Sequence, residues 1–204
     1  MYSMLCLGDS YTVGEGVSPD ERFCSLAVKK LKQQNIFFDE PHVIAQTGWT
    51  TDELIQAIKA NPPETLYDVV TLLIGVNNQY RRLSTDIFAT EYRQLLDMAI
   101  SFCKNGKKGV WCFSIPDWSV TPFVSQDKFG RDAQTICAEI EDFNNIIRSI
   151  TLNLQISLVE ITEISRKASG DASLLAADGL HPSAKMYDMW ADLLYRELIK
   201  KFFN

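Results

Sequence analysis

Apolar runs of strand length alternate along this chain with segments of helical periodicity, and no other feature constrains the fold as strongly. The strand-like runs cover residues 2–7, 37–45, 68–74, 108–114 and 156–161. The helical segments, each with an apolar stripe at a spacing of three and four residues, cover residues 22–33, 51–60, 85–103, 133–152 and 183–203. Five strands that alternate with five helices predict right-handed β-α-β units and one parallel sheet with helices on both faces.

The chain is expected to form a single doubly wound α/β domain over residues 1–204. Its length suits one large core, and it contains no internal repeat and no low-complexity linker. Runs 2–7, 68–74 and 108–114 are continuously apolar, as expected for strands buried on both faces. In such a sheet the segments that follow the strands meet at one edge, where ligands bind, so functional residues should gather there.

Charge and cysteine content argue against several classes of protein. The formal net charge is −6 and no run of like charges occurs, which argues against a nucleic-acid binder. The five cysteines are odd in number and none forms a C-x-x-C pair, so neither a zinc site nor a disulfide framework is expected. We therefore expect no metal ion and no cofactor.

The first residues lack the basic segment and full apolar run of a secretion signal, and no apolar run is long enough to cross a bilayer. We expect a soluble, cytoplasmic protein without stable membrane insertion, although a signal removed beforehand would leave the same sequence. The sequence does not predict an oligomeric state.

A serine lies at the end of the first strand-like run, in Gly8-Asp9-Ser10, and a glycine-rich loop follows. An α/β enzyme can hold a nucleophile there, because the strand fixes the backbone and the hydroxyl faces the edge of the sheet. Gly-Asp-Ser is also ordinary turn composition, so the tripeptide alone favours a turn. We expect Asp9 to brace the loop by accepting hydrogen bonds from backbone amides.

Only two histidines are available as a general base for this serine. His42 lies in a strand-like run, where a structural role at a buried or edge position is expected. His181 lies in a polar loop before the last helix, and Pro182 stiffens that loop, so a serine hydrolase of this sequence would use His181. Asp178, three residues earlier, can reach His181 across a turn at Gly179, although Asp-Gly is also a common turn pair.

Donors for a developing oxyanion are predicted after the second and third strand-like runs. Gly48 precedes a helix start that is marked by Thr50 and Glu53, which match a capping box. Asn77, in Gly75-x-Asn77, carries a neutral amide donor. Each residue taken singly is equally explained as a turn residue. Together with Ser10 and the Asp/His pair, however, they fall where strands end and bring the groups that acyl transfer needs.

The ordered motifs Gly8-Asp9-Ser10, Gly48, Gly75-x-Asn77 and Asp178-x-x-His181 resemble those of the SGNH (GDSL) hydrolase family, and the resemblance extends from end to end of the chain. It implies a three-layer αβα sandwich with a five-stranded parallel sheet and a flavodoxin-like fold. One departure is Asn78, where the family often has aspartate. This departure suggests different packing of that loop and leaves the catalytic groups in place.

The resemblance also implies the roles of the site residues. Ser10 would be the nucleophile, His181 the base and Asp178 the residue that orients His181. The oxyanion hole would consist of the Ser10 and Gly48 amides and the Asn77 side chain. The implied activity is hydrolysis of a small-molecule carboxylic ester, with an acyl group on a small alcohol, a lipid or a carbohydrate. A thioesterase or a carbohydrate deacetylase with the same triad remains an alternative.

Aromatic residues near the predicted edge are candidates for substrate binding. Trp49, Tyr80, Trp118 and Phe123 could line a cleft, although structural packing accounts for each at least as well. Arg81 and Arg82 would suit an anionic substrate group, but a solvated pair is the simpler interpretation.

Two other classes of protein fit the sequence less well. The glycines after the first strand match neither G-x-G-x-x-G nor the P-loop pattern, which argues against nucleotide binding. A non-catalytic ligand-binding module would need a broken triad, and all three residues are present.

Overall fold

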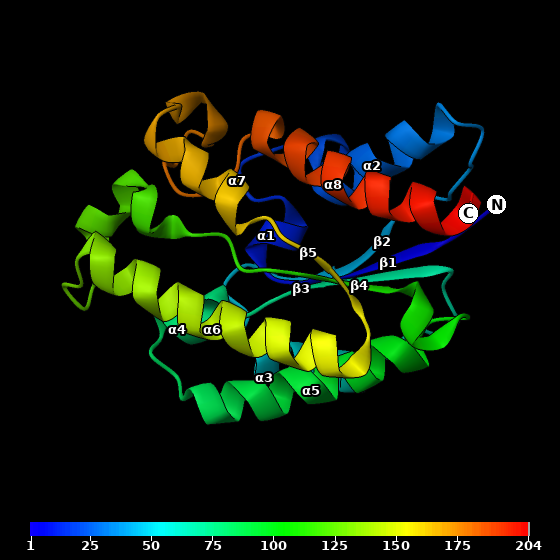
Figure 1. The fold of residues 1–204 in the computed structure, drawn as a ribbon, viewed down its shortest axis with the longest axis horizontal. Helices are drawn as coiled ribbons and strands as arrows, with labels where there is room; N and C mark the ends of the chain where they lie inside the picture. Colours follow the sequence, from blue (N-terminus) through cyan, green and yellow to red (C-terminus); the bar gives the residue numbers. More distant parts are fainter. Residues whose placement is uncertain (204) are drawn as a thin grey trace.

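A parallel sheet forms the centre of the computed structural model, which describes residues 1–203 (Figure 1). The strands are β1 (Met4–Gly8), β2 (His42–Ala45), β3 (Val69–Leu73), β4 (Val110–Phe113) and β5 (Ser157–Val159). Their order across the sheet is β2-β1-β3-β4-β5, and every neighbouring pair is parallel. The predicted α/β class and five-stranded parallel sheet are therefore confirmed.

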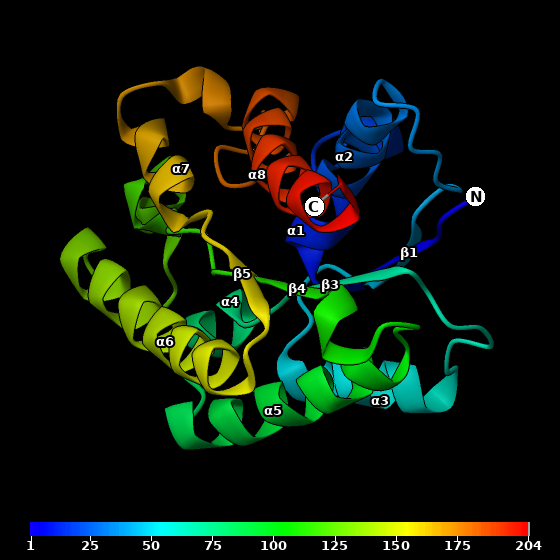
Figure 2. The ribbon, with the colours of Figure 1, turned by 45° about the vertical axis from the view of Figure 1, so that its right-hand side comes forward.

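Helices cover both faces of this sheet, so the molecule has three layers (Figures 1 and 2). One face carries α2 (Phe23–Lys32) and α8 (Ala184–Phe203), and the other carries α3 (Thr51–Ala60), α5 (Thr85–Ser101) and α6 (Ala133–Leu154). Within residues 1–203, no helix combines the length and apolar character needed to span a bilayer.

The apolar pattern of the sequence explains these layers. Every residue of β1, β3 and β4 is buried, as expected for central strands with helices on both sides. On α5 the buried positions recur every three or four residues, which places one stripe against the sheet. The exposed end of β2 and the half-buried β5 lie at the two edges.

Three short helices were not predicted. They are α1 (Ser10–Val13), α4 (Val76–Tyr80) and α7 (Thr162–Arg166). Four or five residues are too few to show an apolar stripe, so periodicity could not reveal them. Ser10 therefore begins a helical turn, and Asn77 lies in α4, where a plain turn was the alternative to an oxyanion role.

The second strand is shorter than the predicted run 37–45. Only an isolated bridge between Tyr2 and Phe38 marks the first part of that run, and β2 begins at His42. Pro41 has no N–H to donate to a neighbouring strand, which accounts for the late start. His42 lies exposed in this edge strand, with Nδ1 2.5 Å from the Tyr67 hydroxyl, in agreement with a structural role.

The strand order determines where a site can form. The chain moves outward from β1 to β2 and then crosses back to β3 on the other side of β1. Crevices in doubly wound sheets open at such a reversal, beyond the carboxyl ends of the two central strands. Here those ends are Gly8 in β1 and Leu73 in β3, which are partners in the sheet register. The segments that carry Ser10 and Asn77 begin at this point.

Candidate active site

Ser10 is placed at the end of β1 by a tight turn into α1. A Cβ atom on Gly8 would lie 2.3 Å from the Leu73 carbonyl oxygen and 2.2 Å from Thr12 Oγ1, so only glycine fits this turn. Asp9 caps α1 by accepting a hydrogen bond of 3.0 Å from the Tyr11 amide through Oδ1. Ser10 is almost fully buried and lines a cavity.

The Asp9 carboxyl is buried beside the serine, and its second oxygen, Oδ2, has no hydrogen-bond partner within residues 1–203. Burial raises the pKa of Asp9 from 3.8 to about 7, even though the Tyr11 amide donates to it. The expected bracing of the loop by Asp9 is therefore present, through one amide, and it coincides with a carboxyl that ionises unusually late.

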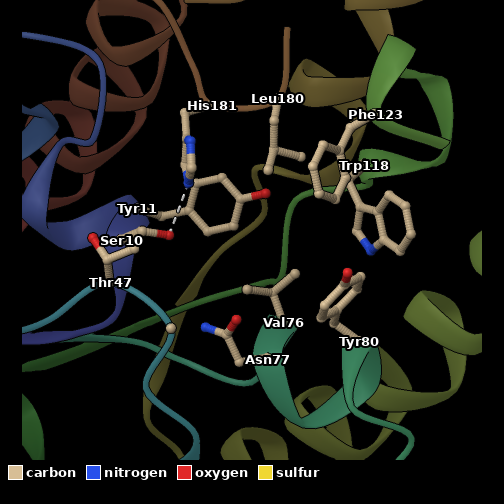
Figure 3. A pocket seen from close by; sticks show the side chains of 11 residues that line it. Ser10, Tyr11, Thr47, Val76, Asn77, Tyr80, Trp118, Phe123, Leu180 and His181 are labelled. Carbon is tan, nitrogen blue, oxygen red and sulfur yellow. Dashed lines mark hydrogen bonds between the residues drawn. The ribbon is translucent and has the colours of Figure 1, made fainter. Parts of the chain in front are cut away.

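His181 and Asp178 meet Ser10 as the sequence predicted. His181 Nε2 lies 3.0 Å from Ser10 Oγ, and His181 Nδ1 lies 2.6 Å from Asp178 Oδ2 (Figure 3). Gly179 adopts φ +69°, the left-handed conformation that turns the chain between the aspartate and the histidine. The geometry is that of a hydroxyl, an imidazole and a carboxylate in series.

Hydrogen bonds hold Asp178 in its charged form. Its Oδ1 accepts from the backbone amides of Leu180 and His181, at 2.9 and 3.0 Å. Partial burial opposes ionisation, but the hydrogen bond from the His181 side chain and the two amides outweigh it, so the pKa of Asp178 lies below its ordinary value. A carboxylate that stays charged can hold one tautomer of His181, with the proton on Nδ1 and Nε2 facing Ser10.

Gly48 and Asn77 line the same cavity as Ser10 and His181. Asn77 Nδ2 donates a hydrogen bond of 3.0 Å to the Trp49 carbonyl, which joins α4 to the loop after β2. An amide NH₂ group has two hydrogens, so this bond fixes the side chain and leaves the second donor for another acceptor.

Arg81 and Asn78 hold these two segments together. Arg81 Nη2 donates to the Gly48 carbonyl at 2.6 Å, and Nη1 lies 3.2 Å from Glu53 Oε1. Asn78, which replaces the family's usual aspartate, is fully buried and accepts from the Thr51 amide at 3.0 Å. Arg81 thus contacts the protein rather than standing as a free cation, and Asn78 connects α4 to the start of α3.

The predicted capping box at the start of α3 is confirmed. The Thr50 amide donates to Glu53 Oε2 at 2.8 Å, and the helix begins at Thr51. Since Glu53 also accepts from Arg81, one carboxylate fixes the helix start and the arginine that holds Gly48.

A cavity of about 170 Å³ opens in front of Ser10 (Figure 3). All five segments that follow the strands contribute to its lining, as predicted for the edge of the sheet. The lining residues are Ser10, Tyr11, Thr47, Gly48, Val76, Asn77, Tyr80, Trp118, Phe123, Leu180 and His181.

Three of the four predicted aromatic residues lie in this lining and form an aromatic wall, which consists of Tyr80, Trp118 and Phe123. Their ring centroids are 5.7 to 6.2 Å apart. Trp118 is buried and donates through Nε1 to Gln79 Oε1 at 2.8 Å. The wall therefore has one ring fixed by a hydrogen bond and two that are held by packing.

Trp49 does not belong to this wall, contrary to the expectation that it would share the cleft. Its side chain lines a separate hollow with His42 and Tyr67 beside β2. The preceding Gly48 has φ +86°, a left-handed turn, and lines the cavity in front of Ser10, which Trp49 does not line. Trp49 contributes only its carbonyl, as the acceptor for Asn77.

Tyr11, Thr47, Val76 and Leu180 also line the cavity and were not singled out in the sequence. Each is adjacent to a predicted site residue, and that adjacency was the available signal. Neighbours of a site residue face either toward it or away from it, depending on local backbone angles, so adjacency alone could not identify them. Within residues 1–203, no three His, Cys, Asp or Glu side chains are grouped closely enough to hold a metal ion.

Comparison with known proteins gives one family and a common fold. The sequence profile of the GDSL-like lipase/acylhydrolase family matches residues 6–189. No curated protein sequence matches the chain.

Several solved structures match over nearly the whole chain. TesA is 18% identical, with a TM-score of 0.74, and the match covers 98% of this chain and 99% of that one. The psychrotrophic esterase EstA from Pseudoalteromonas sp. is 17% identical, with a TM-score of 0.74 and full coverage of both chains. The acetylxylan esterase Axe2 from Geobacillus stearothermophilus is 15% identical, with a TM-score of 0.71, and the match covers 100% of this chain and 94% of that one. At these identities the matches show the shared fold.

Proposed function

The chain belongs to the GDSL-like lipase/acylhydrolase family, and from that premise we propose that it is a serine esterase that acts through an acyl-enzyme on Ser10. The observation that carries the proposal is the series of contacts from Ser10 Oγ to His181 Nε2, at 3.0 Å, and from His181 Nδ1 to Asp178, at 2.6 Å. A hydroxyl becomes a nucleophile when a neighbouring base accepts its proton, and the carboxylate stabilises the resulting imidazolium.

The proposed reaction has two halves. His181 takes the proton of Ser10 as Oγ attacks the ester carbonyl, and then gives that proton to the departing alcohol. A water molecule enters, His181 takes one of its protons, and the hydroxide attacks the acyl-enzyme to release the acid. Ser10 recovers its proton from His181 in that last step.

The developing oxyanion lies, in this proposal, between the Ser10 and Gly48 amides and the Asn77 side chain. The support is positional, because Gly48 and Asn77 line the cavity that Ser10 and His181 also line. The hydrogen bonds from Asn77 to Trp49 and from Arg81 to Gly48 hold both donors before substrate arrives. Donors that are fixed in advance stabilise the transition state without reorganising.

We further infer that the acyl group is short. The cavity is only about 170 Å³ and ends against the aromatic wall, whereas a long-chain lipid needs an extended apolar groove. Esters of small alcohols and acetylated sugars are therefore the first substrates to examine. Thioesters are the second group, since the same triad can attack them.

The experiment is a substrate panel on wild type and on the separate variants Ser10→Ala and His181→Ala. The panel contains short and long p-nitrophenyl esters, an acyl-CoA, acetylated sugars and a lysophospholipid. We expect kcat on short esters to fall by roughly three to six orders of magnitude in either variant, by analogy with other serine triads.

A matched control is Ser25→Ala, on α2, away from the cavity lining. Near-wild-type ester turnover in Ser10→Ala would end the proposal. If only the acyl-CoA or only the acetylated sugars were hydrolysed, the enzyme would be a thioesterase or a carbohydrate deacetylase instead.

A further inference from the structure

Tyr11, the residue that follows the serine, contributes a hydroxyl without a protein partner to a part of the cavity that is lined mainly by carbon atoms. The residue is 3% exposed. No protein atom within residues 1–203 makes a hydrogen bond with its Oη, whereas its main-chain amide and carbonyl are both engaged. Although the ring is buried, the oxygen is not fully enclosed, so it opens onto the cavity and can meet water or a ligand there.

Figure 3 shows where this hydroxyl points. The ring of Tyr11 extends from the Ser10 backbone across the cavity, and its oxygen is directed away from Ser10 toward Leu180 and Phe123. Val76, Leu180, Trp118 and Phe123 offer mainly carbon atoms in this region, and the Tyr80 hydroxyl is a second side-chain oxygen there. We call this mainly apolar part of the cavity, between Tyr11, Val76, Leu180 and the aromatic wall, the chamber. The Tyr11 oxygen lies in the chamber, at some distance from the Ser10 hydroxyl.

The position of Tyr11 is rigidly determined. Its amide donates to Asp9, and its carbonyl accepts from the Tyr187 hydroxyl at 3.0 Å. Its ring lies against the rings of His181 and Trp190, with centroids at 5.6 and 6.1 Å. The two hydrogen bonds fix the backbone of Tyr11, and the neighbouring rings fix its side chain. The hydroxyl is therefore in place before any ligand binds, which lowers the entropic cost of a hydrogen bond to that ligand.

The hydroxyl also stays protonated over the working range of pH. Burial, together with the negative charges of Asp9 and Asp178, raises the pKa of the Tyr11 phenol well above its ordinary value. A neutral phenol can donate one hydrogen bond and accept another. Its natural partner is an oxygen atom, in the form of a hydroxyl, an ether or a carbonyl group.

We propose that Tyr11 is a specificity-determining residue, whose hydroxyl hydrogen-bonds an oxygen atom on the acyl chain, so that the enzyme prefers short acyl groups that carry a hydroxyl or keto group. This inference rests on the proposed esterase function. The acyl half is assigned to this chamber because it stays attached to Ser10 after the alcohol leaves, and Ser10 and Tyr11 line the same cavity.

The Tyr11 hydroxyl can favour one acyl chain over another only when that chain carries an oxygen atom. In the free enzyme a water molecule can satisfy the phenol, but an acyl chain that fills the chamber displaces that water. A plain alkyl chain then leaves the hydroxyl without a partner, whereas an oxygenated chain replaces the lost bond. Sites built around a buried polar group discriminate in this way against ligands that lack the matching atom.

The test compares p-nitrophenyl esters that share one leaving group and differ in the acyl chain: pentanoate, 3-hydroxypentanoate and 4-oxopentanoate. The measured quantity is kcat/KM for the oxygenated ester divided by kcat/KM for pentanoate. We expect Tyr11→Phe to lower this ratio about tenfold, for at least one of the two oxygenated esters, relative to wild type. The fraction of folded enzyme cancels in this ratio, and the different intrinsic reactivities of the two esters cancel when the ratio of the variant is compared with that of wild type.

Tyr92→Phe is the matched control. Tyr92 is a buried tyrosine on α5 whose hydroxyl is also without a partner within residues 1–203, but it lies outside the cavity lining. We expect its removal to leave the ratio at the wild-type value. A ratio that is the same in wild type and Tyr11→Phe would overturn the proposal, and so would an equal fall in Tyr92→Phe.

A second pair of esters shows which half of the substrate meets the Tyr11 hydroxyl. If Tyr11→Phe changes only the preference between 2-hydroxyethyl and propyl esters of pentanoic acid, the hydroxyl serves the alcohol half and the acyl assignment is wrong. Failure of the proposed function would look different, since Ser10→Ala would then keep its turnover. Failure of the Tyr11 assignment alone leaves turnover that depends on Ser10, with an unaltered ratio.

Discussion

The two sides of the cavity are built by different means. The polar side consists of Asp9, Ser10, Gly48, Asn77, Asp178 and His181, and directional hydrogen bonds between neighbouring strand ends hold it. The aromatic wall comes from α4 and from two 3₁₀ turns, Trp118–Val120 and Pro122–Gln126, and ring packing holds most of it. Hydrogen bonds fix an atom to a few tenths of an ångström, whereas packed rings can be exchanged for others of similar volume.

This difference matches the parts of an ester that each side would meet. Every ester has the same carbonyl group, and the polar side offers the same few atoms to any of them. Acyl chains vary in length and polarity, and in our proposal the wall and Tyr11 contact that variable part. We therefore expect changes on the polar side to reduce turnover of all substrates, and changes in the wall to alter the order of preference among them.

The largest effect in this comparison should come from Asn77→Ala. Loss of one oxyanion donor typically lowers kcat by about 10²- to 10³-fold, because the donor acts on charge that develops only in the transition state. The fall should be similar for short and long p-nitrophenyl esters, with KM nearly unchanged. Steady-state kinetics on both esters measures it.

Asn61→Ala provides the control for Asn77→Ala, because Asn61 ends α3 and lines the separate hollow beside β2. Its kcat should stay near the wild-type value. A loss in Asn77→Ala that is below threefold, or that differs strongly between the two esters, would break the proposed division of roles between the two sides.

The second effect concerns the free energy of unfolding, because the polar side buries a carboxyl. The pKa of Asp9 is raised in the folded protein from 3.8 to about 7, so the folded state holds a proton that the unfolded state has lost between these values. The contribution of Asp9 to the free energy of unfolding is therefore fully present at low pH and declines as the pH rises toward about 7. Asp9→Asn keeps the Oδ1 acceptor for the Tyr11 amide and removes the ionisation.

Urea denaturation at pH 5.5 and pH 8 measures this contribution. We expect the free energy of unfolding of wild type, relative to that of Asp9→Asn, to fall by about 2 kcal/mol between the two pH values. Asp20→Asn serves as the control, because the Asp20 side chain is 84% exposed. Its free energy of unfolding should show the same pH dependence as that of wild type. If the free energy of unfolding changed equally with pH in wild type and in Asp9→Asn, the pKa of Asp9 in the folded protein would be close to its ordinary value.

Most positions on the polar side could be predicted because they directly follow a strand. A parallel sheet brings the ends of its strands together, which was enough to group Ser10, Gly48 and Asn77 in space, whereas α7 and two 3₁₀ turns separate His181 from β5. The single available histidine outside the strands made the distance from His181 to Ser10 predictable as well.

The wall could be predicted only in part. Tyr80 faces the cavity because the short helix α4 turns it there, and four or five residues give no periodic signal. Trp49 was misplaced because neighbouring loop residues can line different hollows, and the sequence does not show that Gly48 adopts a left-handed turn just before it. No sequence pattern indicates that the Tyr11 hydroxyl is left unpaired, since that depends on residues from several other segments that surround it.

The smallest effect on turnover, and the largest on preference, should come from the wall. Phe123 is half-buried and its side chain has no hydrogen-bonding group, so Phe123→Ala should enlarge the chamber without removing a hydrogen bond from the polar side. We expect kcat/KM for p-nitrophenyl butanoate to fall less than about fivefold, since only part of an apolar contact is lost. The ratio of octanoate to butanoate should rise at the same time, because longer chains gain the space of the missing ring.

Trp49→Phe is the matched variant that makes this last test decisive. Trp49 is an aromatic residue one position from Gly48, but its ring lines the separate hollow, so trimming it should leave the octanoate-to-butanoate ratio unchanged. A ratio that shifts in Trp49→Phe and not in Phe123→Ala would mean that the acyl chain runs along β2 instead of toward the wall. The chamber that contains Tyr11 would then receive the alcohol, and the assignment of the two halves of the substrate would be reversed.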